Sequence, residues 1–183
     1  MTRVVVVDNG GQFTHLEQRA LRDLGVEAAI VDNATPPEEL DADGIVLSGG
    51  PHEADPERGA RYLGLGVPVL GICLGMQDLA AAHGGEVGPG EYGGYADVTV
   101  TIDDPEDRLL GSLAPETRVW ASHADEVKTV PEGFVRTAHS DVCDVEAMSH
   151  ETEPWFGVQW HPEVAHTEEG TAVFENFLAV CES

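Results

Sequence analysis

Apolar runs of strand length, separated by stretches with helical spacing, restrict the fold of this sequence more than any other feature. The first run covers residues 4–7, and residues 13–24 follow it with apolar positions along one helical face. Similar strand-like runs occupy residues 26–31, 44–48 and 67–72. Runs without polar alternation are typical of strands that are buried on both faces of a sheet. The order therefore predicts an α/β fold with a mostly parallel central sheet flanked by helices.

The second half of the chain has shorter strand-like runs. Residues 95–102 alternate between apolar and polar side chains, as a half-buried strand does. Further short runs occupy residues 118–121, 134–138, 145–148 and 155–160. Residues 168–181 then carry apolar side chains on one helical face. We expect additional mixed or antiparallel strands, a closing helix packed on the sheet, and Pro/Gly-rich loops at residues 49–56 and 84–94.

The chain is strongly acidic and has the size of one domain. Its 183 residues, 42% of them hydrophobic, suffice for one core, so we expect a single domain over residues 1–183. The net charge of −25 would repel nucleic acids and anionic membranes. Because the acids are dispersed, we expect a salt-loving source, where ions screen their repulsion. With no export signal and no apolar stretch of about 20 residues, the cytoplasm is the expected location.

Cys73 occupies the position of a nucleophile. The segment Gly71-Ile-Cys-Leu-Gly75 joins a buried strand to a helix, and small residues on both sides permit the sharp turn that presents the central side chain. The helix N-terminus would stabilise a thiolate there. A core cysteine beside two glycines is the other interpretation. The three cysteines have no paired or Cys-x-x-Cys spacing, so we expect neither a disulfide nor a metal site.

His161 is the candidate base. It ends an apolar run and is followed by Pro162 and Glu163. Residues two apart in extended backbone point the same way, so Glu163 can hydrogen-bond one imidazole nitrogen and leave the other to face a thiol. Taken alone, His161 fits a solvated loop histidine better. Its combination with Cys73 favours catalysis, because functional groups gather at strand ends in α/β folds.

The third segment is Ser48-Gly-Gly-Pro51, which follows a short buried strand. Two glycines at a strand end expose backbone amides. The amides of Gly50 and Leu74 could together form an oxyanion hole, in which each donor contributes roughly 3 kcal/mol. An ordinary turn is the alternative for this segment.

These three segments together resemble the signatures of the class I glutamine amidotransferases. Within that family, the segments Asp8-Asn-Gly-Gly-Gln-Phe13, Trp120-Ala-Ser-His123 and His161-Pro-Glu-Val-Ala-His-Thr167 are most similar to those of GMP synthases. The likeness spans nearly the whole chain and implies a flavodoxin-like core.

The resemblance implies a role for each matched residue. Cys73 would form a γ-glutamyl thioester, His161 would move the proton, and Glu163 would orient His161. Gln77, Ser122 and His123 match family positions in the glutamine pocket. Two departures affect the pocket wall: Ala124 replaces the usual glycine, and residues 90–95 follow the family pattern only in part.

The resemblance also implies a partner. A complete GMP synthase has an ATP-pyrophosphatase domain with a Ser-Gly-Gly-x-Asp-Ser loop, whereas the Ser-Gly-Gly of this chain continues as Pro51-His52. The chain resembles the separately encoded glutaminase subunit of archaea. It would need no cofactor of its own. ATP and Mg²⁺ would bind the partner, the ATP-pyrophosphatase or synthetase subunit of GMP synthase, which converts XMP to GMP.

Three other functions remain open from the sequence. The chain could serve anthranilate or aminodeoxychorismate synthase, although those subunits resemble Asp-Asn-x-Asp-Ser-Phe at residues 8–13. It could be a cysteine peptidase or γ-glutamyl hydrolase that uses the same turn. It could also be a binding module that keeps only the fold, which the complete set of Cys73, His161 and Glu163 disfavours.

Overall fold

The computed structural model covers residues 1–183, with side chains described for residues 1–91 and 97–183. Across the chain that the structure describes, the strands form one mixed sheet in the order β2-β1-β3-β4-β9-β8-β7-β5-β6. The strands are β1 (Arg3–Asp8), β2 (Glu27–Asp32), β3 (Gly44–Leu47), β4 (Val69–Ile72), β5 (Glu86–Ile102), β6 (Glu116–Thr129), β7 (Phe134–His139), β8 (Ala147–His150) and β9 (Trp155–Val158). The α-helices are α1 (Thr14–Asp23), α2 (Pro56–Ala60), α3 (Leu74–Ala82) and α4 (Gly170–Cys181), and single 3-10 turns lie at Pro37–Glu39, Leu63–Leu65 and Gly111–Leu113.

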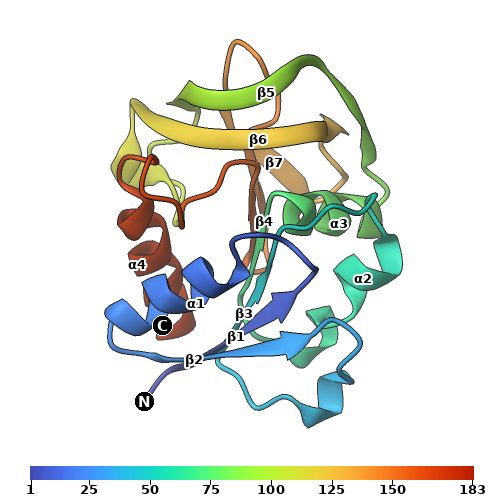
Figure 1. The fold of residues 1–183 in the computed structure, drawn as a ribbon, viewed down its shortest axis with the longest axis vertical. Helices are drawn as coiled ribbons and strands as arrows, with labels where there is room; N and C mark the ends of the chain where they lie inside the picture. Colours follow the sequence, from blue (N-terminus) through green and yellow to red (C-terminus); the bar gives the residue numbers. More distant parts are fainter.

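The first half of the chain forms the parallel part of the sheet, as predicted. β1 pairs in parallel with β2 and β3, β3 with β4, and β4 with β9. Side chains of β1 alternate between two cores: Val4 and Val6 face the core that contains Phe174 of α4, and Val5 and Val7 face the opposite one. Helices α1 and α4 lie on one side of these strands and α2 and α3 on the other (Figure 1). Burial of both faces accounts for the unbroken apolar runs.

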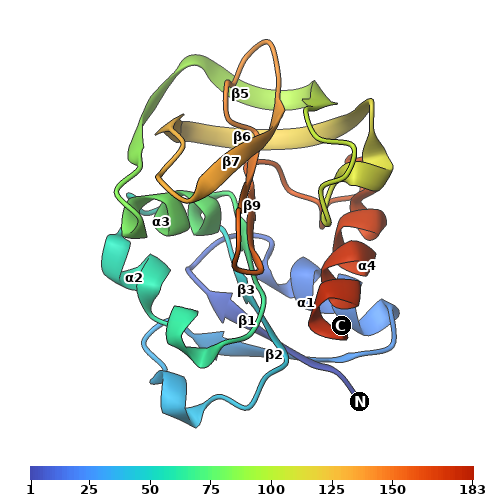
Figure 2. The same cartoon turned by 180° about the vertical axis from the view of Figure 1, so that it is seen from behind.

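The second half adds antiparallel strands, also as predicted. β8 pairs with β9 and β7, and β5 pairs with β7 and with the long strand β6. Seen from behind, β5 and β6 form a ribbon that crosses one end of the molecule (Figure 2). None of the helices in the described part of the chain combines the length and apolar character needed to cross a bilayer.

Two predicted boundaries are wrong. The sequence predicts a loop over residues 84–94, but β5 begins at Glu86. Its pairing with β6 shifts register between Pro89 and Gly94, so the ladder accommodates residues that disfavour strands. Pairing with β5 also extends β6 to Thr129, well beyond the short run predicted at residues 118–121. The side chains of residues 92–96, most of which belong to the predicted pocket-wall segment 90–95, lie outside the described residues.

Candidate active site

Cys73 lies at a sharp turn between β4 and α3. Its backbone has φ 55° and ψ −109°, a conformation that non-glycine residues rarely adopt and that is common at catalytic sites. The turn needs glycines on both sides. A Cβ on Gly75 would overlap the carbonyl group of Leu47, and one on Gly71 would lie 2.6 Å from the carbonyl oxygen of Gly75. The glycines therefore allow the start of α3 to pack against β3 and β4 with Cys73 at the helix N-terminus.

The sulfur of Cys73 is mostly enclosed by polar partners. Cys73 is 8% exposed, and its Sγ lies 3.9 Å from the carbonyl oxygen of Ser122. The side-chain amide of Gln159 donates to Sγ over 3.5 Å. Oε1 of Gln159 also accepts from Nε2 of Gln77 at 3.2 Å, so a series of side-chain hydrogen bonds runs from α3 to the sulfur. The sulfur therefore lies between a side-chain amide donor and the N-terminus of α3.

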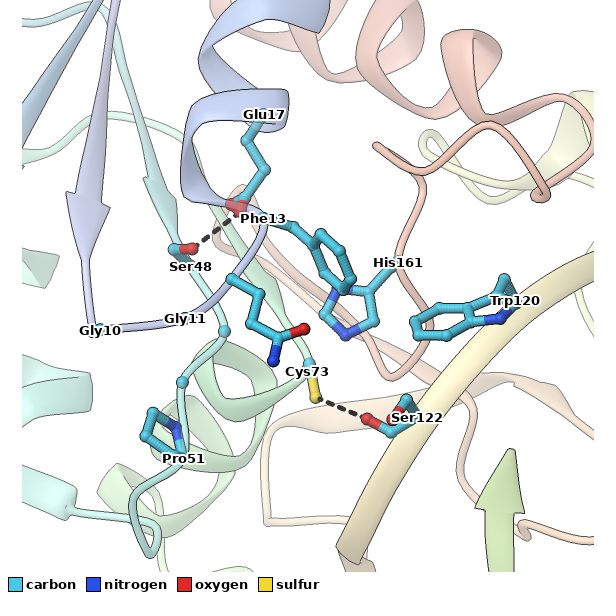
Figure 3. A pocket seen from close by; sticks show the side chains of 13 residues that line it. Gly10, Gly11, Phe13, Glu17, Ser48, Pro51, Cys73, Trp120, Ser122 and His161 are labelled. Carbon is cyan, nitrogen blue, oxygen red and sulfur yellow. Dashed lines mark hydrogen bonds between the residues drawn. The ribbon is translucent and has the colours of Figure 1, made fainter. Parts of the chain in front are cut away.

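His161 and Glu163 form a buried pair beside Cys73. Nδ1 of His161 lies 3.2 Å from Oε2 of Glu163, whose side chain is fully enclosed. A Cβ added to Gly49 would lie 3.3 Å from Cε1 of His161 and 3.5 Å from Cβ of Cys73, so ring and thiol approach the same glycine. Phe13 and Trp120 flank the imidazole, with ring centroids 5.2 Å and 5.8 Å away (Figure 3). This packing holds the ring in one orientation.

The charges of the site favour an imidazolium. Burial lowers the pKa of His161, but its hydrogen bonds to Cys73 and Glu163, and the charges of these two groups, outweigh burial and raise the pKa to about 10. At neutral pH the ring is therefore protonated and lies beside the nucleophile. An imidazolium can donate its proton to a leaving amine after a thiolate has attacked.

Two cavities meet at Cys73. The first, which we call the Gln77 cavity, has a volume of about 390 Å³. The second, the Phe13 cavity, has a volume of about 370 Å³ and is drawn in Figure 3. Ser122, Gly50 and Cys73 line both cavities, whereas His161 and Glu17 line only the Phe13 cavity. The nucleophile can thus be reached from either cavity.

All the predicted pocket residues line the Gln77 cavity. They are Gly50, Leu74, Gln77, Ser122 and His123. Gly50 packs so closely on Asn9 that a Cβ would overlap the Asn9 carbonyl group. Gln77 is 4% exposed, and its Nε2 already donates to the Asp125 carbonyl at 2.9 Å as well as to Gln159. This geometry makes Gln77 a support of the cavity wall.

Two polar residues of the site are not predicted from the sequence. Gln159, described above, lies in an apolar run that carries no sign of its contact with sulfur. Glu17 of α1 is 1% exposed and accepts a hydrogen bond from Ser48 Oγ at 2.7 Å (Figure 3). Burial, followed by the charge of Glu163, raises the pKa of Glu17 well above its usual range. Its only sequence signal is a carboxylate on the otherwise buried face of a helix.

The chain has similar proteins over its whole length. A family model for class I glutamine amidotransferases matches residues 5–181. A protein of Haloarcula marismortui, named as a subunit of glutamine-hydrolysing GMP synthase, is 72% identical over 100% of this chain and 96% of its own. The protein of the same name from Archaeoglobus fulgidus is 50% identical, over 98% of each chain.

Solved structures agree with the fold. A structure from Thermoplasma acidophilum, described as that of a GMP synthase subunit, has a TM-score of 0.92 and 38% identity and covers 100% of this chain and 94% of that one. A glutamine amidotransferase of Thermotoga maritima has a TM-score of 0.73 at 21% identity, over 89% of this chain and 76% of its own, and is similar in fold. Because the family model matches residues 5–181 and the 72% identical relative covers the whole chain, the chain belongs to the class I glutamine amidotransferase family.

Proposed function

We propose that this chain is the glutaminase subunit of a two-subunit GMP synthase. It hydrolyses glutamine to glutamate and ammonia, and a separate synthetase subunit uses the ammonia to convert XMP to GMP. The placement of Cys73 on a strained turn beside the His161–Glu163 pair supports the hydrolysis. The names of relatives that are 72% and 63% identical over the full chain support the pathway.

The reaction begins in the Gln77 cavity, where the side-chain amide of glutamine meets the sulfur. The Cys73 thiolate attacks the amide carbon, and the carbonyl oxygen takes the negative charge. The backbone amides of Gly50 and Leu74, which line the same cavity, are the proposed donors to that oxygen. The imidazolium of His161 gives its proton to the nitrogen, the C–N bond breaks, and ammonia leaves the γ-glutamyl thioester.

Water completes the cycle. His161, now neutral, takes a proton from a water molecule that attacks the thioester carbon. The C–S bond breaks, glutamate leaves, and the thiolate and imidazolium are restored. Glu163 holds the ring through Nδ1 in both steps, which keeps Nε2 directed at the reacting groups.

The partner carries the remaining chemistry in this proposal. The synthetase subunit, an ATP-pyrophosphatase, binds ATP and Mg²⁺, and the glutaminase reaction needs neither. The cytoplasm, where soluble nucleotide precursors are available, is the proposed location.

The test separates the two activities. With the synthetase subunit, XMP, ATP and Mg²⁺, Cys73→Ala should abolish GMP formation from glutamine, because the nucleophile is gone, and should leave formation from ammonium unchanged. Cys181→Ala, in α4 and remote from both cavities, is the matched control and should retain both activities.

Two results would contradict the proposal at different levels. Glutamine-dependent GMP formation by Cys73→Ala would remove the nucleophile from the mechanism. Glutamine hydrolysis stimulated by a chorismate-using enzyme, and not by the GMP synthetase subunit, would leave the glutaminase in place and change the pathway.

A further inference from the structure

Three mostly buried side chains, none of them Cys73, His161 or Glu163, converge between β6 and the turn that precedes β8, and a fourth lies beside them. Ligand atoms of His123, Cys143 and Glu146 all lie within 4.8 Å of one another. Glu126 joins them from β6, and its charge and that of Glu146 both act on the Cys143 thiol. We propose that His123, Cys143, Glu146 and Glu126 form a structural zinc site.

The two carboxylates each present one uncommitted oxygen. Oε2 of Glu146 accepts from Ser140 Oγ at 2.7 Å, whereas its Oε1 has no hydrogen-bond partner among the side chains that the structure describes. Oε1 of Glu126 accepts from Lys128 Nζ at 2.7 Å, and its Oε2 has no partner within the same described part of the chain. Glu146 is 0% exposed and Glu126 7% exposed, so water cannot readily supply these bonds. Buried bare oxygens are costly unless a cation binds them.

The imidazole of His123 is prepared as a neutral ligand. Its Nδ1 lies 3.0 Å from the backbone carbonyl oxygen of Asp125, so Nδ1 carries the hydrogen and Nε2 keeps its lone pair. Metal-binding histidines in proteins usually make this outer hydrogen bond to a carbonyl or carboxylate. Ser140 and Lys128 do the same for the two carboxylates. Each of these three ligands therefore has an outer partner that fixes its orientation.

The donor set and the charges both suit zinc. The imidazole nitrogen, the sulfur and the Glu146 oxygen that lie close together supply three ligands, and Glu126 is the proposed fourth ligand of a tetrahedral structural site. A thiolate with an imidazole selects zinc over magnesium or calcium. A thiolate and two carboxylates are balanced by a divalent ion together with Lys128, the only lysine of the chain. A bound divalent cation would keep the Cys143 thiolate ionised.

The site lies behind the wall of the Gln77 cavity. His123 lines that cavity, and the neighbouring Asp125 carbonyl accepts the amide of Gln77. A metal ion there would tie β6 to the turn before β8 and so hold this wall in place. No local pattern in the sequence indicates the site, because Cys143 and Glu146 are separated from His123 by strand β7 and lack the spacing of a zinc motif.

The test measures metal content directly. The full chain is purified without an affinity tag from zinc-supplemented cultures and carries Cys73→Ala, which removes the catalytic thiol as a competing ligand. Elemental analysis should find about one zinc per chain. After removal of zinc with a chelator, Co²⁺ should produce a thiolate-to-cobalt charge-transfer band and the intense visible bands of tetrahedral cobalt.

Variants assign the ligands. Cys143→Ser should abolish the charge-transfer band, whereas Cys181→Ser, the matched control, should keep it. Ser140→Ala, which removes an outer partner, should weaken zinc binding roughly 10- to 100-fold. If Cys143→Ser does not fold, Glu146→Gln replaces it, with loss of zinc as the expected result.

Three results would overturn the proposal. The first is a zinc content below about a tenth of an equivalent per chain, since a structural site binds its ion stoichiometrically. The second is a full zinc content in Cys143→Ser or Glu146→Gln. The third is a melting temperature that does not change when zinc is removed and restored. None of these depends on glutaminase activity, so the proposed function could fail while this site stands.

Discussion

The ionisation of His161 depends on its two neighbours. Burial alone would lower the pKa of the ring, yet Cys73 and Glu163 raise it to about 10. Because the pKa in the folded state lies above the usual value of 6.5, this proton stabilises the fold fully below pH 6.5. The stabilisation declines as the pH rises from 6.5, where the unfolded state loses the proton, through about 10, where the folded state loses it as well.

Cys73→Ala should therefore lower the pKa of His161. The substitution removes a hydrogen bond and a negative charge that raise it, and it leaves burial in place. Titration of the His161 Cε1–H resonance in wild type and variant measures both pKa values. An unchanged pKa would mean that Glu163 alone holds the proton.

Glu17 gives a second prediction, in which stability again falls as the pH rises. Because the pKa of Glu17 lies well above its usual 4.5 in the folded state, folding takes up a proton once the pH exceeds 4.5, and wild type loses stability as the pH rises from there. Glu17→Gln keeps an oxygen that can accept from Ser48 and has no proton to bind. It should match wild type near pH 4 and become the more stable protein toward neutral pH, as urea unfolding at a series of pH values would measure. A variant that becomes less stable instead would show that Glu17 is ionised.

These residues differ in how well sequence could predict them. Cys73 is recognisable because the turn that presents it requires local glycines, and His161 because Pro162 and Glu163 follow directly. Glu17 and Gln159 belong to segments without such signals, and their contacts come from far away in the sequence: Ser48 is 31 residues from Glu17, and Cys73 is 86 residues from Gln159. No local pattern encodes such partners.

Among the elements, the parallel strands were predictable, whereas the β5–β6 ribbon was predicted only in part, over residues 95–102 and 118–121. Strands buried on both faces leave unbroken apolar runs, which identified β1, β3 and β4. The ribbon is stabilised by pairing between strands, so glycines and Pro89 enter β5 against their own preference. The wall of the Gln77 cavity is built partly from β6, which is why its details could be expected only from family likeness.

The junction of β4 and α3 should tolerate no side chain at Gly75. Gly75→Ala places a Cβ against the Leu47 carbonyl of β3, and rigid backbone has to move. We expect a loss of about 1–3 kcal/mol in the free energy of unfolding, as for overpacked cores, together with a fall in glutaminase activity as Cys73 shifts. Urea denaturation and a coupled glutamate assay measure the two effects.

Gly64→Ala is the matched control, because a Cβ there meets no atom within 4 Å. It should change stability by less than about 0.5 kcal/mol. Because Gly→Ala at an unhindered position restricts mainly the unfolded chain, equal losses at both glycines would show that the contact with β3 does not determine the cost.

At the scale of the whole molecule, the net charge of −25 should make the fold depend on salt. Acids outnumber bases 34 to 9, so most long-range charge pairs on the surface repel. Added salt also weakens exposed attractions such as Arg118–Asp97, but these are few and each contributes at most about 1 kcal/mol. The more enclosed pair between Arg58 and Asp78, at 2.6 Å, is screened much less.

The melting temperature should therefore rise steeply with KCl concentration while the Debye length falls from about 30 Å at 0.01 M to about 3 Å at 1 M. Beyond that range screening is nearly complete, and a further rise would come from salts that strengthen apolar burial. Melting temperatures in potassium chloride and potassium sulfate, compared at equal ionic strength, separate the two effects. Equal melting temperatures indicate screening, and higher ones in sulfate indicate strengthened apolar burial.

A fold that is fully stable in dilute buffer would mean that the dispersed carboxylates are far enough apart not to repel one another appreciably. In that case the acidity would affect solubility and the choice of partner, and would have little influence on stability.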